Sequence, residues 1–317
     1  MAVREYVLRQ VVGMVPVLII VSIISFGLLY VLPGDPATAI LGENAGNQAT
    51  YEALRHNLGL DRPLWMQYTD WLGRLLQGDM GKSIRTGEPV SVVLLQRIPV
   101  TLYVGFGGLL VGVLIGLPAA IVSALKPGSK LDLAGTVFAL GGIAIPSFWQ
   151  ALLFIYVFAL VLRWLPPSGY TPLLSDPGTS LRMLLMPAIV LGTHSAAVIM
   201  RQSRAALLEV FEQEYVIVAR AKGLREPRVV LVHALKNAMI PIVTILGLQV
   251  GNLVAGAAIT ETIFAIPGVG RAAVDAIFFR DFPVLQGAVI VLTVGVMLAN
   301  LLADIAYAYF DPRIRLS

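Results

Sequence analysis

The sequence contains no cysteine and only three histidines in 317 residues. The absence of cysteine excludes disulfides, thiolate metal sites and cysteine nucleophiles. No histidine and carboxylate residues cluster with metal-ligand spacing, and no serine, histidine and aspartate set indicates hydrolysis. The sequence therefore argues against an enzyme, and we expect no catalytic residue and no metal ligand in this chain.

Charge is also scarce, because only 13% of the residues are Asp, Glu, Lys or Arg, whereas 57% are hydrophobic. Soluble domains carry about 25% charged residues. Six runs contain no charged residue, and about 20 apolar residues are enough for a helix to cross a bilayer. These runs are 10–32, 99–124, 133–162, 183–200, 238–260 and 284–303. We therefore predict an all-α integral membrane protein with six transmembrane helices. The third run is longer than a span needs, which predicts a tilted helix or one that lies partly outside the membrane.

None of the six runs contains a carboxylate, since Glu261 and Asp304 lie just beyond the ends of their runs. A proton-driven transporter normally needs a titratable group at mid-membrane, and His194 alone could replace a carboxylate there. This absence disfavours a secondary transporter or a channel, which remains the alternative function. A membrane scaffold is a third possibility, but it would need neither glycine-rich spans nor polar residues inside them.

Basic residues indicate the orientation of the chain. Lys and Arg are denser in segments 1–9, 125–132, 201–237 and 304–317 than in segments 33–98, 163–182 and 261–283. The positive-inside rule then places both termini and the 201–237 loop in the cytoplasm of a multi-pass membrane protein. The first run is too long for the core of a signal peptide, so we expect an uncleaved helix. No basic face remains for binding a nucleic acid.

We divide the chain at residue 98. Residues 1–98 hold the first transmembrane helix, 10–32, and a long outer segment, and residues 99–317 form a transmembrane core of five helices with the loop 201–237. In the outer segment, 33–98, the sequence predicts a helix over 45–58, a break over 59–63 and then an amphipathic helix. Trp65, Tyr68 and Trp71 line one side of that second helix. Aromatic side chains favour the lipid headgroup level, although docking to an outer partner is also possible.

Two glycine-rich segments resemble nucleotide-binding motifs only in part. Gly78–Ser83 is not a complete P-loop, because Leu76 stands where the first glycine is required and no strand precedes it. Gly268–Ala273 follows a proline in an outer loop rather than a strand. We therefore expect no nucleotide site in this chain, and any ATP must be bound by another subunit.

The most informative segment is the polar, basic stretch 201–237 between two apolar runs. It shows helical spacing up to Lys222, where a basic side chain suits the end of a helix. Gly223 is placed as a helix C-cap, and Pro227 suits the first turn of the next helix. The pattern predicts a helix-turn-helix that serves as a docking surface for another protein, with an unstructured solvated loop as the alternative.

Polar residues inside the spans are few. His194, Gln249 and Asn252 are candidates for the lining of a translocation pathway, although a hydrogen-bonded structural role is equally open. Gly108, Gly112 and Gly116 recur every four residues and predict close helix packing, within this chain or against a second subunit.

The 201–237 segment resembles the coupling loop of ABC importer permeases. The residues that carry this resemblance are Glu214–Gly223, ending in Ala219-Arg220-Ala221-Lys222-Gly223, and Asn237–Pro241. The family's general Glu-Ala-Ala-x-x-x-Gly form is incomplete here, but the Ala-Arg-Ala-Lys-Gly version is typical of the subgroup that carries dipeptides, oligopeptides, glutathione or nickel. Further matches to that subgroup are Leu32–Pro36, Leu58–Pro63, Gly78–Ser83, Pro267–Arg271, Arg280–Pro283 and Phe310–Arg315.

The resemblance implies the type I ABC importer permease fold and the first-permease subunit of a binding-protein-dependent importer in the bacterial inner membrane. It implies that residues 99–317 are the permease core and that the outer segment up to residue 98 is periplasmic. It implies a second homologous permease, two ATP-binding cassette subunits that bind ATP and Mg²⁺, and an extracytoplasmic substrate-binding protein. The residues that would contact the ATPase are Glu214, Ala219, Arg220, Ala221, Lys222, Gly223, Arg225 and Arg228. The sequence does not distinguish among the subgroup's substrates.

Overall fold

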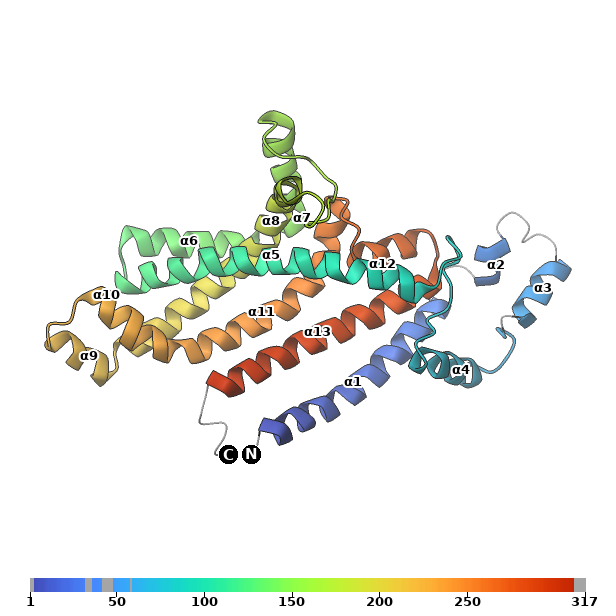
Figure 1. Cartoon of the computed structure of the whole chain (residues 1–317), viewed down its shortest axis with the longest axis horizontal. Helices are drawn as coiled ribbons and strands as arrows, with labels where there is room; N and C mark the ends of the chain where they lie inside the picture. Colours follow the sequence, from blue (N-terminus) through green and yellow to red (C-terminus); the bar gives the residue numbers. More distant parts are fainter. Residues whose placement is uncertain (1–2, 32–35, 42–47, 58, 311–317) are drawn as a thin grey trace. The chain divides into compact units, whose positions relative to one another are not determined.

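The computed structural model describes residues 3–31, 36–41, 48–57 and 59–310. These residues are helical apart from connecting loops and one isolated bridge between Lys82 and Pro89. The elements in chain order are α1 (Val3–Val31), α2 (Pro36–Leu41), α3 (Gln48–Asn57), α4 (Leu64–Leu76), α5 (Val90–Leu125), α6 (Lys130–Ala144), α7 (Ser147–Phe154), the π-helix η2 (Ile155–Val161), α8 (Pro177–Phe211), α9 (Glu214–Ala221), α10 (Glu226–Arg228), the π-helix η3 (Val229–Ala234), α11 (Leu235–Ile263), α12 (Val269–Phe278) and α13 (Phe282–Phe310) (Figure 1). The predicted all-α fold is confirmed.

Local sequence determines where several helices begin. Ser129 caps α6 by accepting a hydrogen bond from the Asp132 amide, and Asp176 caps α8 by accepting one from Thr179. Pro177 follows at the start of α8, where its missing N–H is not needed. The predicted helix over 45–58 appears as α3, while residues 45–47 and 58 of that region lie outside the described residues.

Among the described residues, four helices are long and apolar enough to cross a membrane, namely Leu8–Tyr30, Val90–Leu125, Pro177–Phe211 and Phe282–Ile305. Two bent pairs also qualify if each pair is one span, Lys130–Ala144 with Ser147–Val161 and Glu226–Met239 with Pro241–Val254. The chain thus has between four and six spans. The long run 133–162 is not one straight helix, because it bends by 102° between α6 and α7. Pro146, directly before α7, has no N–H with which to continue α6.

The described chain forms two compact units. Unit 1 comprises Met1–Val11, Leu102–Ile266 and Val296–Ser317, and in it α8 packs against α6 and α11. Its glycines allow this approach, since a Cβ added to Gly116 would lie 2.6 Å from the carbonyl oxygen of Ala196. The glycine spacing of α5 therefore serves contact with α8 of the same chain.

Unit 2 comprises Val12–Thr101 and Pro267–Gly295. Its core joins the first turns of α5 to α12 and to the start of α13, through Val90, Leu94, Val269 and Leu285 among others. The aromatic residues of α4 divide between two environments. Tyr68 and Trp71 pack on Phe26 of α1, with ring centroids 5.6 and 5.8 Å away, whereas Trp65 is 63% exposed.

Candidate functional site

The predicted helix-turn-helix exists as α9 and α10, beside the end of α8 and the start of α11 in unit 1 (Figure 1). It is shorter than its pattern indicated, because the helical segment breaks at Glu212 and Gln213 before α9 begins. Val216 and Ala219, three residues apart on α9, are buried in the same core as Leu207 of α8 and Val229 of η3. Helix α9 is therefore fixed to the helix bundle of unit 1 along one face.

The turn between α9 and α10 depends on Gly223. Its φ is +75°, and its N–H donates to the Arg220 carbonyl, 2.9 Å away. The predicted glycine C-cap is confirmed, since glycine adopts this conformation without a steric penalty. Across the turn, Arg220 binds Glu226 through two hydrogen bonds, of which the Nη2–Oε1 bond is 2.7 Å long. The guanidinium of Arg220 also lies over the Phe211 ring, 5.3 Å from its centroid.

The other face of α9 is exposed and apolar. Tyr215, Ile217 and Val218 are 42%, 54% and 50% exposed, which is unusual for apolar residues on a helix with an otherwise buried side. Burial raises the pKa of the Tyr215 hydroxyl, against a hydrogen bond from Asn237 that lowers it, so this face stays uncharged near neutral pH. The exposed cations Lys222, Arg225 and Arg228 make no ion pair with any described residue. An apolar patch bordered by unpaired positive charge is suited to binding another protein.

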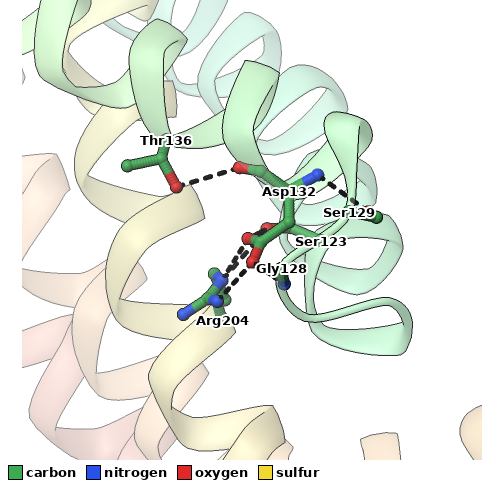
Figure 2. A network of polar contacts seen from close by, with 6 residues as sticks. All are labelled: Ser123, Gly128, Ser129, Asp132, Thr136 and Arg204. Atoms are coloured by element: carbon green, nitrogen blue, oxygen red, sulfur yellow. Dashed lines mark hydrogen bonds and ion pairs between the residues drawn. The ribbon is translucent and has the colours of Figure 1, made fainter.

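A polar network joins α8 to the start of α6 and to the end of α5 (Figure 2). Arg204 of α8 donates from Nε to Asp132 Oδ1 at 2.7 Å and from Nη2 to Asp132 Oδ2 at 2.8 Å. The amide of Gly128 donates to Asp132 Oδ2 at 2.8 Å, and the Ser123 hydroxyl donates to Asp132 Oδ1. Asp132 is 6% exposed, so its carboxylate accepts its hydrogen bonds from protein groups rather than from water. We call Asp132, Arg204 and Ser123 the α6–α8 clamp.

The clamp joins the turn between α5 and α6 to the helix that leads into α9. Sequence analysis did not identify it. The Ser129-Lys-Leu-Asp132 pattern before an apolar run is a capping-box signal, and Ser129 indeed caps α6. That signal locates Asp132 at a helix start but says nothing about Arg204, which is 72 residues further along the chain.

The residues predicted to contact an ATPase fall into two groups. Glu214, Arg220, Ala221, Lys222, Gly223, Arg225 and Arg228 are all exposed on the α9–α10 segment. Ala219 instead lies in the core at 6% exposure. Sequence analysis missed Ile217 and Val218, although Val216 and Ala219, three residues apart, define a buried face of α9 from which both point away. It also missed Glu226, the partner of Arg220.

The three candidate pathway residues lie on α8 and α11, which pack together. His194 and Asn252 are exposed on these helices, whereas Gln249 is 4% exposed and its Oε1 has no hydrogen-bond partner among the described residues. Their role in a pathway stays a prediction.

Comparison with known proteins identifies the family. Residues 112–316 match the family described as "Binding-protein-dependent transport system inner membrane component". Residues 3–105 match the N-terminal region described as "Binding-prot-dependent transport system membrane comp, N-term". The chain belongs to this family. It is thus a permease subunit of a binding-protein-dependent ABC importer, which confirms the family that the 201–237 segment resembles.

Relatives of this permease match it over nearly their whole length. It is 41% identical to the "Di/tripeptide transport system permease protein DppB" of Pseudomonas aeruginosa over 98% of both chains. It is 36% identical to the "Dipeptide transport system permease protein DppB" of Escherichia coli K12, and 38% identical to the "Oligopeptide transport system permease protein AppB" of Bacillus subtilis, in each case over 98% of both chains.

Solved structures share the fold of the permease. A chain of the MetNI methionine ABC transporter superposes with a TM-score of 0.56 and 20% identity, over 69% of this chain and 96% of that one. A chain of an amino acid ABC transporter superposes with a TM-score of 0.53 and 17% identity, over 69% of this chain and 94% of that one. At this identity the likeness concerns the fold alone.

Proposed function

We propose that this permease imports peptides. The proposal is supported by relatives whose names specify di- and tripeptides, dipeptides and oligopeptides, and which align over almost the entire chain. The substrate would reach the permease from an extracytoplasmic substrate-binding protein and pass between this chain and a second homologous permease. The chain itself would do no chemistry, because two partner subunits would bind ATP and Mg²⁺ and hydrolyse the nucleotide.

The α9–α10 segment would be the ATPase-coupling element. The observation that carries this proposal is the division of α9 into two faces. Val216 and Ala219 hold it in the core, while Tyr215, Ile217 and Val218 face outward. A partner that moves α9 would therefore move α8 and η3 with it, because Leu207 and Val229 share that core. Lys222, Arg225 and Arg228 would bind an acidic rim on the ATPase.

The clamp would extend this movement to α6. Arg204 holds Asp132 by two bonds, so displacement of the cytoplasmic end of α8 would carry the α5–α6 turn with it. Both chain termini and the α9–α10 segment would lie in the cytoplasm, and the segment up to residue 98 that follows α1 would be periplasmic. His194, Gln249 and Asn252 would line the pathway, because polar groups are costly against lipid.

The test of coupling is Gly223→Val in the reconstituted transporter, with Gly87→Val as its matched control. Both glycines have φ of +75° and open space where a Cβ would be built, so each substitution carries the same backbone strain of about 1–2 kcal/mol. Only Gly223 lies in the proposed ATPase contact. We expect Gly223→Val to reach the membrane at normal abundance, to lose receptor-stimulated ATP hydrolysis and to reduce uptake, while Gly87→Val keeps both activities.

Normal stimulation and uptake in Gly223→Val would remove the coupling role from α9–α10. The substrate class is tested separately, by measuring uptake of labelled dipeptides, oligopeptides, glutathione and nickel by the same reconstituted transporter. Transport of glutathione or nickel in preference to any peptide would contradict the peptide assignment without affecting the coupling proposal.

A further inference from the structure

Unit 2 contains a cavity of about 610 Å³ that the import function does not require. One wall is formed by α4, and another by the loop that links α4 to α5, from Asp79 to Ile84. The floor combines Phe26 and Leu29, near the end of α1, with Phe282 and Gln286, at the start of α13. The cavity therefore opens where two membrane-spanning helices reach the same surface of the membrane.

The loop wall is held in a fixed conformation. Asp281 accepts hydrogen bonds from the Ser83 hydroxyl and from the Ile84 amide, the latter at 3.0 Å. Asp79 accepts one from the Gly81 amide at 2.8 Å, and Gly78 and Gly81 both have positive φ. This is the Gly78–Ser83 segment, which lacks the first glycine of a P-loop. Its structure is a rigid wall rather than a nucleotide-binding loop.

The helical wall presents one polar face. Gln67, Asp70, Trp71 and Arg74 are spaced by three or four residues on α4, and all of them line the cavity. The rest of α4 is strongly apolar at Leu64, Trp65 and Leu76, which are 57%, 63% and 79% exposed. An amphipathic helix with this division lies in the plane of the membrane surface, with its apolar face toward the acyl chains.

The cavity is lined by more basic than acidic side chains. Arg62 pairs with Asp70 at 3.3 Å, and Asp79 is engaged by the Gly81 amide. The side chains of Arg74 and Lys82 make no ion pair or hydrogen bond with any described residue. Gln286 is only 7% exposed, and its side chain lines the cavity without a hydrogen bond to the described part of the chain. Two exposed cations without an ion-pair partner and one amide line this cavity, a set of groups suited to an anionic ligand with hydrogen-bond acceptors.

We propose that this cavity binds the phosphate group of a phospholipid, with Arg74 and Lys82 on the phosphate and Gln286 on an ester or glycerol oxygen. The apolar floor supports a lipid rather than a free phosphate ion. Phe26 and Phe282 lie where the first carbons of an acyl chain would leave the headgroup, and α1 exposes apolar residues such as Ile19, Ile20 and Ile23 beside it. Basic pockets between spanning helices bind phospholipid headgroups on the cytoplasmic side of membranes, and the same charge-assisted contacts would act at this outer surface.

The probe for the experiment is Trp71, which lines the cavity. The other tryptophans, Trp65, Trp149 and Trp164, are 63%, 48% and 67% exposed, so each can be replaced by Phe with little loss of packing. The full chain with Trp71 as its single tryptophan, purified in detergent, is titrated with dihexanoyl phosphatidylglycerol. We expect a saturable change in Trp71 emission. The phosphate-free dihexanoyl glycerol should bind about tenfold more weakly or worse, because it lacks the charge-assisted contacts.

The decisive variant is Arg74→Gln with Lys82→Gln, and its matched control is Arg97→Gln with Arg182→Gln. The control removes the same charge from residues outside the cavity that make no ion pair within the described chain. We expect the cavity variant to weaken phosphatidylglycerol binding by about tenfold or more and the control to leave it unchanged. Phospholipid extracted with the purified protein should fall in parallel in the cavity variant alone.

Three results would overturn the proposal. Equal binding by the cavity variant and the control would show that Arg74 and Lys82 do not contact the ligand. An equal response to inorganic phosphate at the same concentrations would make the site one for a free anion rather than a lipid. Loss of receptor binding with unchanged lipid binding would assign the two cations to a protein partner.

Discussion

Arg204 and Asp132 meet through two parallel hydrogen bonds of 2.7 and 2.8 Å, which join α8 to the first turn of α6. Asp132 is buried, and it also holds the Gly128 amide and the Ser123 hydroxyl. The planar guanidinium matches the carboxylate in geometry as well as charge, so lysine would not be an equivalent replacement for Arg204. Breaking such a pair from one side leaves the other charge uncompensated.

The α6–α8 clamp therefore predicts how substitutions at Arg204 and Asp132 change the stability of the protein. Arg204→Gln should lower both membrane abundance and melting temperature, because Asp132 loses its only ion-pair partner among the described residues. The double variant Arg204→Gln with Asp132→Asn should be less damaged than Arg204→Gln alone, since no unpaired charge remains. Arg201→Gln, on an exposed and unpaired residue of the same helix, is the control and should behave like the unaltered protein. Additive effects in the double variant would contradict the clamp.

The close contact between α5 and α8 at Gly116 predicts how alanine substitutions in α5 change the stability of the protein. Gly116→Ala should destabilise the protein by about 1–3 kcal/mol, because the new methyl group would lie 2.6 Å from the backbone oxygen of Ala196 and must push α5 from α8. Gly105→Ala, on the same helix with no atom within 4 Å of the added Cβ, should be neutral or stabilising by up to about 1 kcal/mol. Thermal unfolding in one detergent measures both. Equal effects would mean that α5 and α8 do not pack as described.

The start of α8 predicts a pH dependence. Hydrogen bonds from Thr179 lower the pKa of Asp176 below its ordinary value of 3.8. A carboxyl whose pKa is lowered on folding stabilises the protein above that ordinary value and loses this contribution as pH falls through the native pKa. The stability difference between the unaltered protein and Asp176→Asn should be constant near neutral pH and change only below about pH 5, mostly below 3.8. A change in this difference between pH 5 and about pH 7 would contradict the cap.

Orientation can be tested with cysteines, because the natural chain has none. Single cysteines at Thr50, Ser175 and Asp275 should react with a membrane-impermeant maleimide added to intact cells. A cysteine at Glu212, next to α9, should react only after the cells are opened. Labelling of Glu212→Cys in intact cells would reverse the proposed orientation and place the coupling segment on the wrong side for an ATPase.

Charge-free runs and helix-end residues made much of the fold predictable. The uncharged runs located α1, α5, α8, α11 and α13, because the cost of charge in lipid leaves a direct trace in composition. Gly223 and Pro227 located the turn between α9 and α10, because each residue has a conformational preference that acts locally. The bend between α6 and α7 lies inside one continuous apolar run, where Pro146 is its local signal, and the prediction of a tilted or overlong helix did not use that residue.

The remaining features of the site depend on contacts between distant residues. Asp132 and Arg204 are separated by 72 positions, and no local pattern pairs them. Ala219 lies in a motif that suggested surface contact, yet its position three residues after Val216 places both on the buried face of α9. The pocket in unit 2 was equally hidden, because Arg74, Lys82 and Gln286 come from three separate segments.

The bond between Ser83 and Asp281 has a consequence for the order of biosynthesis. These residues lie 198 positions apart, and Asp281 directly precedes the last helix of the chain. A ribosome releases Ser83 long before Asp281 exists, so the loop from Asp79 to Ile84 has no anchor while the intervening helices enter the membrane. The cavity wall is completed only when α13 arrives, and until then its floor is open to the surrounding bilayer. A lipid that occupies the finished cavity can therefore be enclosed during assembly, without a later opening of the protein.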